Sequence, residues 1–179
     1  MYITKSCITF ITIIATTLLF SVNAFATDYQ HSITVEDITL DWKIDGETMA
    51  IKLSAKTNGW VGIGFNPESR MKGANIILGY VKKGEVKISD EFGHKKTMHK
   101  KDTKLGGENN VTLIKGSEEG KITTLEFTIP LNSSDSSDGS INPSGDNTVL
   151  LAYGERDSRR SGHAFNETIT LNLATGVMK

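Results

Sequence analysis

The sequence predicts an all-β fold, a single antiparallel β-sandwich. Three observations lead to this prediction. Apolar and polar residues alternate strictly in several short runs, which is the period of a half-buried strand. Glycine-containing or polar turns separate these runs, and no stretch of the mature chain keeps a helical period. Eight or nine short strands of this kind are typical of a sandwich.

The first strands follow one another closely. We expect strands over 39–45, 48–55 and 60–65, where the first two alternate most clearly. Asp45-Gly46 joins the first two runs and Asn58-Gly59 joins the second to the third. Both dipeptides supply the positive φ angles of tight hairpin turns, so this part of the chain is predicted to be an antiparallel meander.

The remaining strands are expected after these three, at 74–81, 85–92, 110–115, 121–130, 147–154 and 167–173. Residues 131–146 form a Ser/Asp/Gly-rich loop between the strands expected at 121–130 and 147–154. Within it, "DSSDGS" (135–140) lacks the acidic spacing and the glutamate of an EF-hand, so we interpret it as a turn.

Two tryptophans and two glycines stand out in the strands. Trp42 and Trp60 are expected to anchor the core, because each begins or lies within an alternating run; the alternative is that they are stacking platforms for a ligand. Gly62 and Gly64 weaken a strand, so they predict a β-bulge; the alternative is a place where a flat ligand approaches the backbone.

Residues 1–26 have the pattern of a cleaved signal peptide. Lys5 precedes an apolar run, and Ala24 and Ala26 fit the small-residue requirement of signal peptidase. We expect cleavage after Ala26, which leaves residues 27–179 as one periplasmic or secreted domain without a stable membrane anchor; an uncleaved anchor is the alternative. Cys7 lies before the apolar run, which argues against a lipoprotein.

The composition of the mature chain limits its chemistry. Cleavage removes the only cysteine, so disulfides, thiolate ligands and covalent haem attachment are excluded, and histidine, methionine, carboxylates and the backbone remain as ligands. Removing Lys5 from the 20 basic residues leaves 19 against 21 acidic ones, a net charge of −2. This balance gives no support for nucleic-acid binding. No Ser-His-Asp set or carboxylate pair stands out as catalytic.

Two loops concentrate unusual residues. Residues 94–104 hold five lysines together with His94, Met98 and His99. Imidazole and thioether suit Cu(I), although the lysines raise the cost of adding a cation; a solvated basic loop and a docking patch for an acidic redox partner are the other interpretations. Residues 154–166 carry His163 between two small residues.

Met71 lies between Arg70 and Lys72, in a turn-like segment where an apolar side chain is unexpected. One hypothesis is that Met71 and His163 are the axial ligands of a non-covalently bound haem, since thioether and imidazole favour a low-spin iron suited to electron transfer. Both lie in inter-strand loops, which gather at the two ends of a sandwich. The alternative is that they are packing and surface residues, and spacing alone leaves both open.

An ordered set of motifs resembles the DOMON domain family over residues 33–173. The motifs are Trp42, "GWVGIGFNP", "MKGANIILGYV", a strand ending in Asp90, "TTLEFTIPL" followed by Asp135 and Asp138, "LLAYG" and the late His163. The resemblance implies an immunoglobulin-like sandwich that binds either haem b or a sugar. Many members are extracytoplasmic electron-transfer modules, the haem-binding type including the cytochrome domain of cellobiose dehydrogenase.

Carried over to this chain, the resemblance implies that Met71 and His163 ligate the iron of haem b. Asn75 stands where many members have an aspartate, which leaves a carboxylate role there without support. We expect cationic partners for the haem propionates near the ligands, or otherwise solvated loop charges; the candidates are Arg70, Lys72, Arg159 and Arg160.

The resulting expectation is an exported b-type cytochrome that transfers electrons and is not itself an enzyme. A redox partner protein would dock at the basic loop 94–104. The alternative is a carbohydrate or small-ligand binding module of the same fold.

Overall fold

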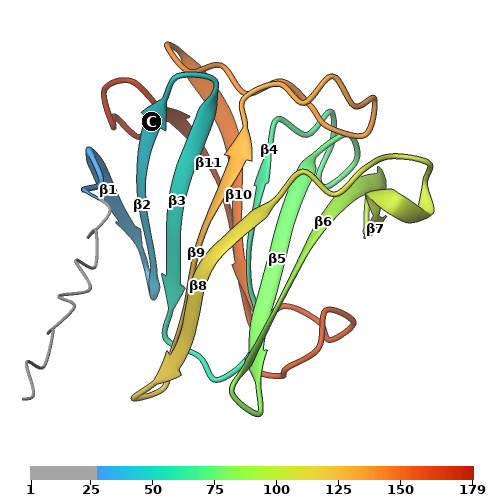
Figure 1. Ribbon diagram of the computed structural model, residues 1–179. Helices are drawn as coiled ribbons and strands as arrows, with labels where there is room; N and C mark the ends of the chain where they lie inside the picture. The colour runs from blue at the N-terminus through green and yellow to red at the C-terminus, as the bar shows by residue number, and fades with distance from the viewer. Residues whose placement is uncertain (1–27) are drawn as a thin grey trace, which may run out of the picture.

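The computed structural model describes residues 28–179, which form two antiparallel sheets packed face to face (Figure 1). The expected signal peptide, residues 1–26, lies outside the described residues. One sheet has the strand order β1-β2-β3-β9-β8, and its strands are β1 (His31–Val35), β2 (Ile38–Asp45), β3 (Thr48–Ala55), β9 (Ile122–Pro130) and β8 (Thr112–Glu119).

The second sheet has the order β11-β10-β4-β5-β6-β7. Its strands are β11 (Phe165–Asn172), β10 (Asp146–Tyr153), β4 (Val61–Phe65), β5 (Asn75–Lys82), β6 (Glu85–Lys95) and β7 (Met98–Lys101). A 3₁₀ turn, η1 (Asp102–Lys104), follows β7. The predicted all-β sandwich is therefore confirmed. Within residues 28–179, no helix has the length and apolar character needed to cross a membrane.

The strand β7 was not expected, because residues 94–104 were interpreted as a loop. In the structure β6 extends to Lys95 and a short turn leads into β7, which pairs with β6 at the edge of the sheet. Exposed and half-buried residues alternate along β7. A lysine-rich strand is usual at a sheet edge, where charge discourages pairing with another chain, and it shows no apolar alternation in the sequence.

The two turn dipeptides behave differently. Asp45-Gly46 closes the β2–β3 hairpin as predicted, with Gly46 at φ +59°. The hairpin predicted at Asn58-Gly59 is wrong, because β3 and β4 belong to different sheets. Here the chain crosses between the sheets and packs against the β10–β11 connection, where Thr57 Oγ1 donates a hydrogen bond of 2.8 Å to the Gly154 carbonyl. A Cβ on Gly59 would lie 2.2 Å from that same oxygen.

The core lies between the sheets and includes Trp42, as expected. Its side chain is completely buried, and its indole N–H donates to the Leu173 carbonyl at 3.0 Å. Alternate residues of the opposing strands fill the same layer, among them Leu40, Ile51, Leu53, Ile63, Phe65, Ile77, Phe127, Val149 and Leu171.

Strand β4 has a regular register, so the bulge predicted at Gly62 and Gly64 is wrong. Gly62 pairs with Leu78 on β5 and Ala152 on β10 without any shift. Because Ile63 is part of the core and side chains alternate along a strand, the two glycines face away from the core. The outer face of this sheet is therefore unusually flat at β4.

Trp42 provides a test of the core. We expect Trp42→Phe to lower the free energy of unfolding by about 1–3 kcal/mol, because it leaves the buried Leu173 carbonyl without its donor. Trp42→Ala should cost about 3–5 kcal/mol, because it also opens a cavity. Urea unfolding followed by circular dichroism measures both, with the exposed Ile114→Ala as the control expected to change stability by less than about 0.5 kcal/mol.

Candidate functional site

A cavity of about 490 Å³ lies on the outer face of the six-stranded sheet. Its floor consists of two cross-strand rows, Leu78–Gly62–Ala152 and Ile76–Gly64–Leu150, which the register of β5, β4 and β10 places side by side. The glycines form the central line of this floor and aliphatic side chains flank them. Ile76 and Leu78 are only 7% and 3% exposed although they lie on the outer side of the sheet. The cavity size is in the range of small-molecule and cofactor sites.

Met71 reaches the cavity from the β4–β5 connection, which is held firmly against β6. The Gly73 N–H donates to the Gly93 carbonyl at 2.7 Å, and the Gly93 N–H donates to Ala74 at 3.0 Å. The Met71 N–H donates to the Lys96 carbonyl at 3.3 Å. Met71 is partly buried and lines the cavity. Backbone hydrogen bonds to β6 and the following turn fix its position outside the strands.

His163 reaches the same cavity from the β10–β11 connection. Trp60 anchors this segment, since its indole N–H donates to Ser161 Oγ at 2.9 Å and its ring meets the His163 ring edge-on, with centroids 5.4 Å apart. Trp60 is 2% exposed, but it forms part of the cavity wall and does not belong to the core cluster between the sheets, so the predicted core position is confirmed for Trp42 alone. Partial burial, with a smaller contribution from His99, lowers the pKa of His163. The lowered pKa favours the neutral imidazole, which is the form that can ligate a metal.

The connections that carry Met71 and His163 lie at opposite ends of the sheet. Val61, at the start of β4, pairs with Tyr153 at the end of β10, so the β10–β11 connection follows Tyr153 at one end while the β4–β5 connection follows Phe65 at the other. Figure 1 shows the β10–β11 segment at the lower end of the sandwich. The two side chains thus enter one cavity from its two ends.

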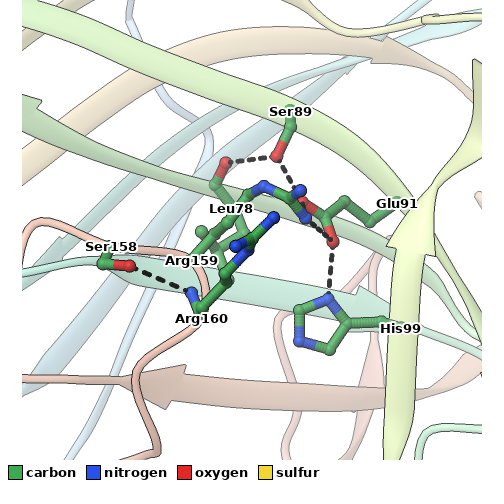
Figure 2. A network of polar contacts seen from close by, with 7 residues as sticks. All are labelled: Leu78, Ser89, Glu91, His99, Ser158, Arg159 and Arg160. Carbon is green, nitrogen blue, oxygen red and sulfur yellow. Dashed lines mark hydrogen bonds and ion pairs between the residues drawn. The ribbon is translucent and has the colours of Figure 1, made fainter.

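A buried carboxylate beside this cavity holds two cationic or ionisable partners (Figure 2). The Glu91 side chain is completely buried; its Oε2 lies 2.6 Å from Nδ1 of His99, and its Oε1 lies 2.7 Å from Ser89 Oγ and 3.3 Å from Arg159. Burial alone would raise the pKa of Glu91, but the hydrogen bonds from His99 and Ser89 and the charges of His99 and Arg159 together hold it below the usual range. The ionised carboxylate only accepts, so Nδ1 of His99 donates.

The predicted propionate partners are distributed unevenly. Arg70 lines the cavity, with its backbone at φ +53°. Lys72 forms an ion pair with Glu68 and does not line the cavity. Arg159 is directed to Glu91, and Arg160 is exposed, its backbone N–H donating to Ser158 Oγ (Figure 2).

The residues proposed for copper are also separated by their environments. His99 lines the cavity and is bonded to Glu91, whereas Met98 is 50% exposed. Nδ1 of His94 is buried without a hydrogen-bond partner.

Sequence reasoning missed Glu91, His99 as a cavity residue, and the aliphatic floor. A signal for the floor was present, because residues 76–78 and 149–152 are continuously apolar where β2 and β3 alternate. Such a run is typical of a strand buried on both faces. Where alternation fails in a sheet that packs one face on the core, its other face is apolar as well, and that face needs a cover.

The chain belongs to the DOMON domain family, whose model matches residues 34–154. Among curated proteins it is similar to DBH-like monooxygenase protein 1 of Mus musculus, with 32% identity over 72% of this chain and 20% of that protein. It is also similar to a cytochrome b561 and DOMON domain-containing protein of Arabidopsis thaliana, with 48% identity over 25% of this chain and 12% of that protein. The chain spans about a fifth of the length of the monooxygenase relatives it matches.

Two solved cytochrome domains have a similar fold. The cytochrome b domain of pyranose dehydrogenase from Coprinopsis cinerea superimposes with a TM-score of 0.61 at 12% identity, covering 78% of each chain. The cytochrome domain of cellobiose dehydrogenase from Myriococcum thermophilum gives 0.60 at 16% identity, covering 76% of this chain and 74% of that domain. The predicted family and its structural likeness to cytochrome domains are confirmed.

Gly93 allows a test of how Met71 is positioned. A Cβ at Gly93 would lie 1.5 Å from the Met71 carbonyl oxygen, so Gly93→Ala must push the β4–β5 connection away from β6. We expect a loss of about 1–3 kcal/mol in the free energy of unfolding, measured by urea denaturation. Gly139→Ala is the matched control, because its nearest neighbour would be an ordinary contact at 3.7 Å. Equal stability of the two variants would contradict the proposed docking of the loop.

Proposed function

We propose that this chain binds one haem b non-covalently, with Met71 and His163 as axial ligands, and transfers single electrons. The observation that carries the proposal is the entry of these two side chains into one cavity from opposite ends of the sheet. A thioether and a neutral imidazole are the ligand pair of low-spin haem proteins with raised potential. The family and the similar cytochrome domains support the same interpretation.

The cavity also fits a flat apolar macrocycle. Gly62 and Gly64 place no side chain on the floor, and Ile76, Leu78 and Leu150 provide an apolar surface around them, with Ile76 and Leu150 closing over Gly64. Apolar burial controls the potential of a haem by limiting solvent access and local dielectric.

Cationic side chains are available for the propionates at the cavity rim. Arg70 and Lys96 line the cavity, and guanidinium and ammonium groups form charge-assisted hydrogen bonds with carboxylates. A propionate role for Lys72, Arg159 and Arg160 stays a prediction. Lys72 and Arg159 already pair with carboxylates of the protein, and Arg160 is exposed.

When bound, the haem iron would supply the redox chemistry, and the protein would supply ligands, a partly dry pocket and a docking surface. We propose that the partner is a redox protein that approaches the exposed lysines near the cavity, among them Lys95, Lys96 and Lys100. Electrostatic complementarity of this kind mainly raises the association rate and is weakened by salt. Export to the periplasm or outside the cell, after cleavage of residues 1–26, is part of the same proposal.

A spectrum of the purified protein tests the haem proposal. Protein made with haem available should show sharp α and β bands on reduction, and Met71→Ala and His163→Ala should each abolish the low-spin spectrum, because each removes one axial ligand. Met98→Ala is the control, since this exposed methionine lies outside the cavity. Its spectrum should match that of the unmodified protein.

Protein that remains colourless after addition of haem would contradict the proposal. Calorimetric titration with sugars would then test the carbohydrate-binding alternative, in which polar rim residues such as Asn166 and Thr168 contact the ligand and Met71→Ala has no effect.

A further inference from the structure

Three aspartates from distant parts of the chain meet at the edge of the sandwich, away from the cavity. Asp90 lies on β6, Asp102 begins η1, and Asp138 lies in the connection between β9 and β10. One carboxylate oxygen of each lies within 4.8 Å of the others. The three carboxyl groups thus meet at one point although each comes from a different segment of the chain.

Five of the six side-chain oxygens of these aspartates are buried and have no hydrogen-bond partner, and the sixth, Oδ2 of Asp90, accepts from the Asn110 N–H. Asp102 is 0% exposed, and neither of its side-chain oxygens has a partner. Asp90 is 3% exposed with Oδ1 unpaired, and both oxygens of Asp138 are also unpaired. Buried polar groups are nearly always satisfied, so these acceptors require either protons shared between the carboxyl groups or a positive charge beside them.

No cationic side chain supplies that charge. Among residues 28–179, none of the lysine, arginine or histidine ion pairs involves Asp90, Asp102 or Asp138. Burial, followed by the charges of the neighbouring Asp90 and Asp138, raises the pKa of Asp102 to about 8. Burial likewise raises the pKa of Asp90 to about 7 and raises that of Asp138. Like charges this close disfavour ionisation unless a cation lies between them.

The neighbouring Asp135, by contrast, is a carboxylate whose oxygens have hydrogen-bond donors in the same region. It accepts hydrogen bonds from the backbone N–H groups of Ser137 at 2.8 Å and Glu108 at 2.5 Å, and these bonds lower its pKa. Asp135 therefore holds the two loops together and leaves the three open carboxylates to face one another.

We propose that Asp90, Asp102 and Asp138 bind a divalent cation of the hard, oxygen-seeking class, with Ca²⁺ as the first candidate. All three donors are carboxylate oxygens, which suit Ca²⁺, Mg²⁺ and Mn²⁺ and not the softer Cu(I). Asn110, whose N–H donates to Asp90 at 2.7 Å, has a buried and unpaired side-chain oxygen and is a candidate fourth ligand. The inference is independent of haem binding.

The proposed ion would join the edge of the six-stranded sheet to the β9–β10 connection. β6 and η1 belong to the six-stranded sheet and its edge, whereas Asp138 lies in the connection that leaves β9 of the other sheet. A ligand that binds the native state and not the unfolded chain stabilises the native state in proportion to the logarithm of its concentration. The cation is therefore expected to act on stability.

The test uses the full chain, stripped with EDTA and a chelating resin and then titrated with CaCl₂ up to about 10 mM, beyond the about 10⁻³ M weak limit of extracellular calcium modules. We expect calorimetry to show one Ca²⁺ per chain and the melting temperature to rise with CaCl₂ but not with NaCl of equal ionic strength. Circular dichroism follows the melting, so the readout does not depend on haem.

Asp102→Asn should weaken Ca²⁺ binding by more than about tenfold, because it removes one anionic ligand. Asp45→Asn is the matched control, with the same charge change at the exposed β2–β3 turn, where Asn-Gly is equally suited. This variant should bind Ca²⁺ as the unmodified chain does. Asp138→Asn, which changes the loop ligand, serves as a second variant if Asp102→Asn does not fold.

Absence of binding and of any melting shift with CaCl₂, MgCl₂ and MnCl₂ would overturn the proposal and leave three carboxyl groups that share protons. An equal Ca²⁺ response in Asp102→Asn, Asp138→Asn and Asp45→Asn would overturn it as well. Neither result depends on whether the protein is coloured.

Discussion

The candidate site depends on the outer face of β4, where glycine replaces the side chains that a sheet normally shows to solvent. Gly62 and Gly64 face the cavity while Ile63 between them belongs to the core. Apolar residues on the adjoining strands complete a surface that water would solvate poorly. A face of this kind needs a cover, and the loops at both ends of the sheet supply its walls. The candidate site therefore depends on a local break in the usual alternation of inward apolar and outward polar residues in a sandwich.

The walls hold their positions by different interactions. Backbone hydrogen bonds to Gly93 and Lys96 attach the Met71 connection to β6, and Trp60 anchors the His163 connection through Ser161. Between them, Glu91 orients His99 and Arg159. Pre-organised side chains lose less entropy when a ligand binds, so this scaffold suits a cofactor that must be held in one orientation.

Local patterns in the sequence were sufficient for much of the fold. Alternation and Asp45-Gly46 predicted the first hairpin, because both are properties of adjacent residues. The hairpin predicted at Asn58-Gly59 was wrong, because a turn dipeptide does not determine whether the next strand joins the same sheet. Strand β7 was not predicted, because its lysines leave no apolar alternation in the sequence.

Met71 and His163 were predicted through the family resemblance, and their spacing of 92 positions in the sequence carries no geometric information by itself. Glu91 and His99 could not be found in the same way, since their pairing depends on the β6–β7 hairpin. "DSSDGS" was interpreted as a turn because it lacks the acidic spacing and the glutamate of an EF-hand, which are properties of one local segment. The acidic cluster takes its three members from three segments, so only the fold brings Asp138 to Asp90 and Asp102.

Adjacent residues of one strand connect the two candidate sites. Asp90 and Glu91 point to opposite faces of β6, and both are buried, yet the pKa of Glu91 is lowered while that of Asp90 is raised to about 7. The difference comes from their partners, because Glu91 has His99 and Arg159 whereas Asp90 faces other carboxylates. A cation between Asp90 and Asp102 would bind both ends of the segment that contains His99. The ion proposed at one face of β6 would thereby stabilise the cavity wall on the other, without contacting anything inside the cavity.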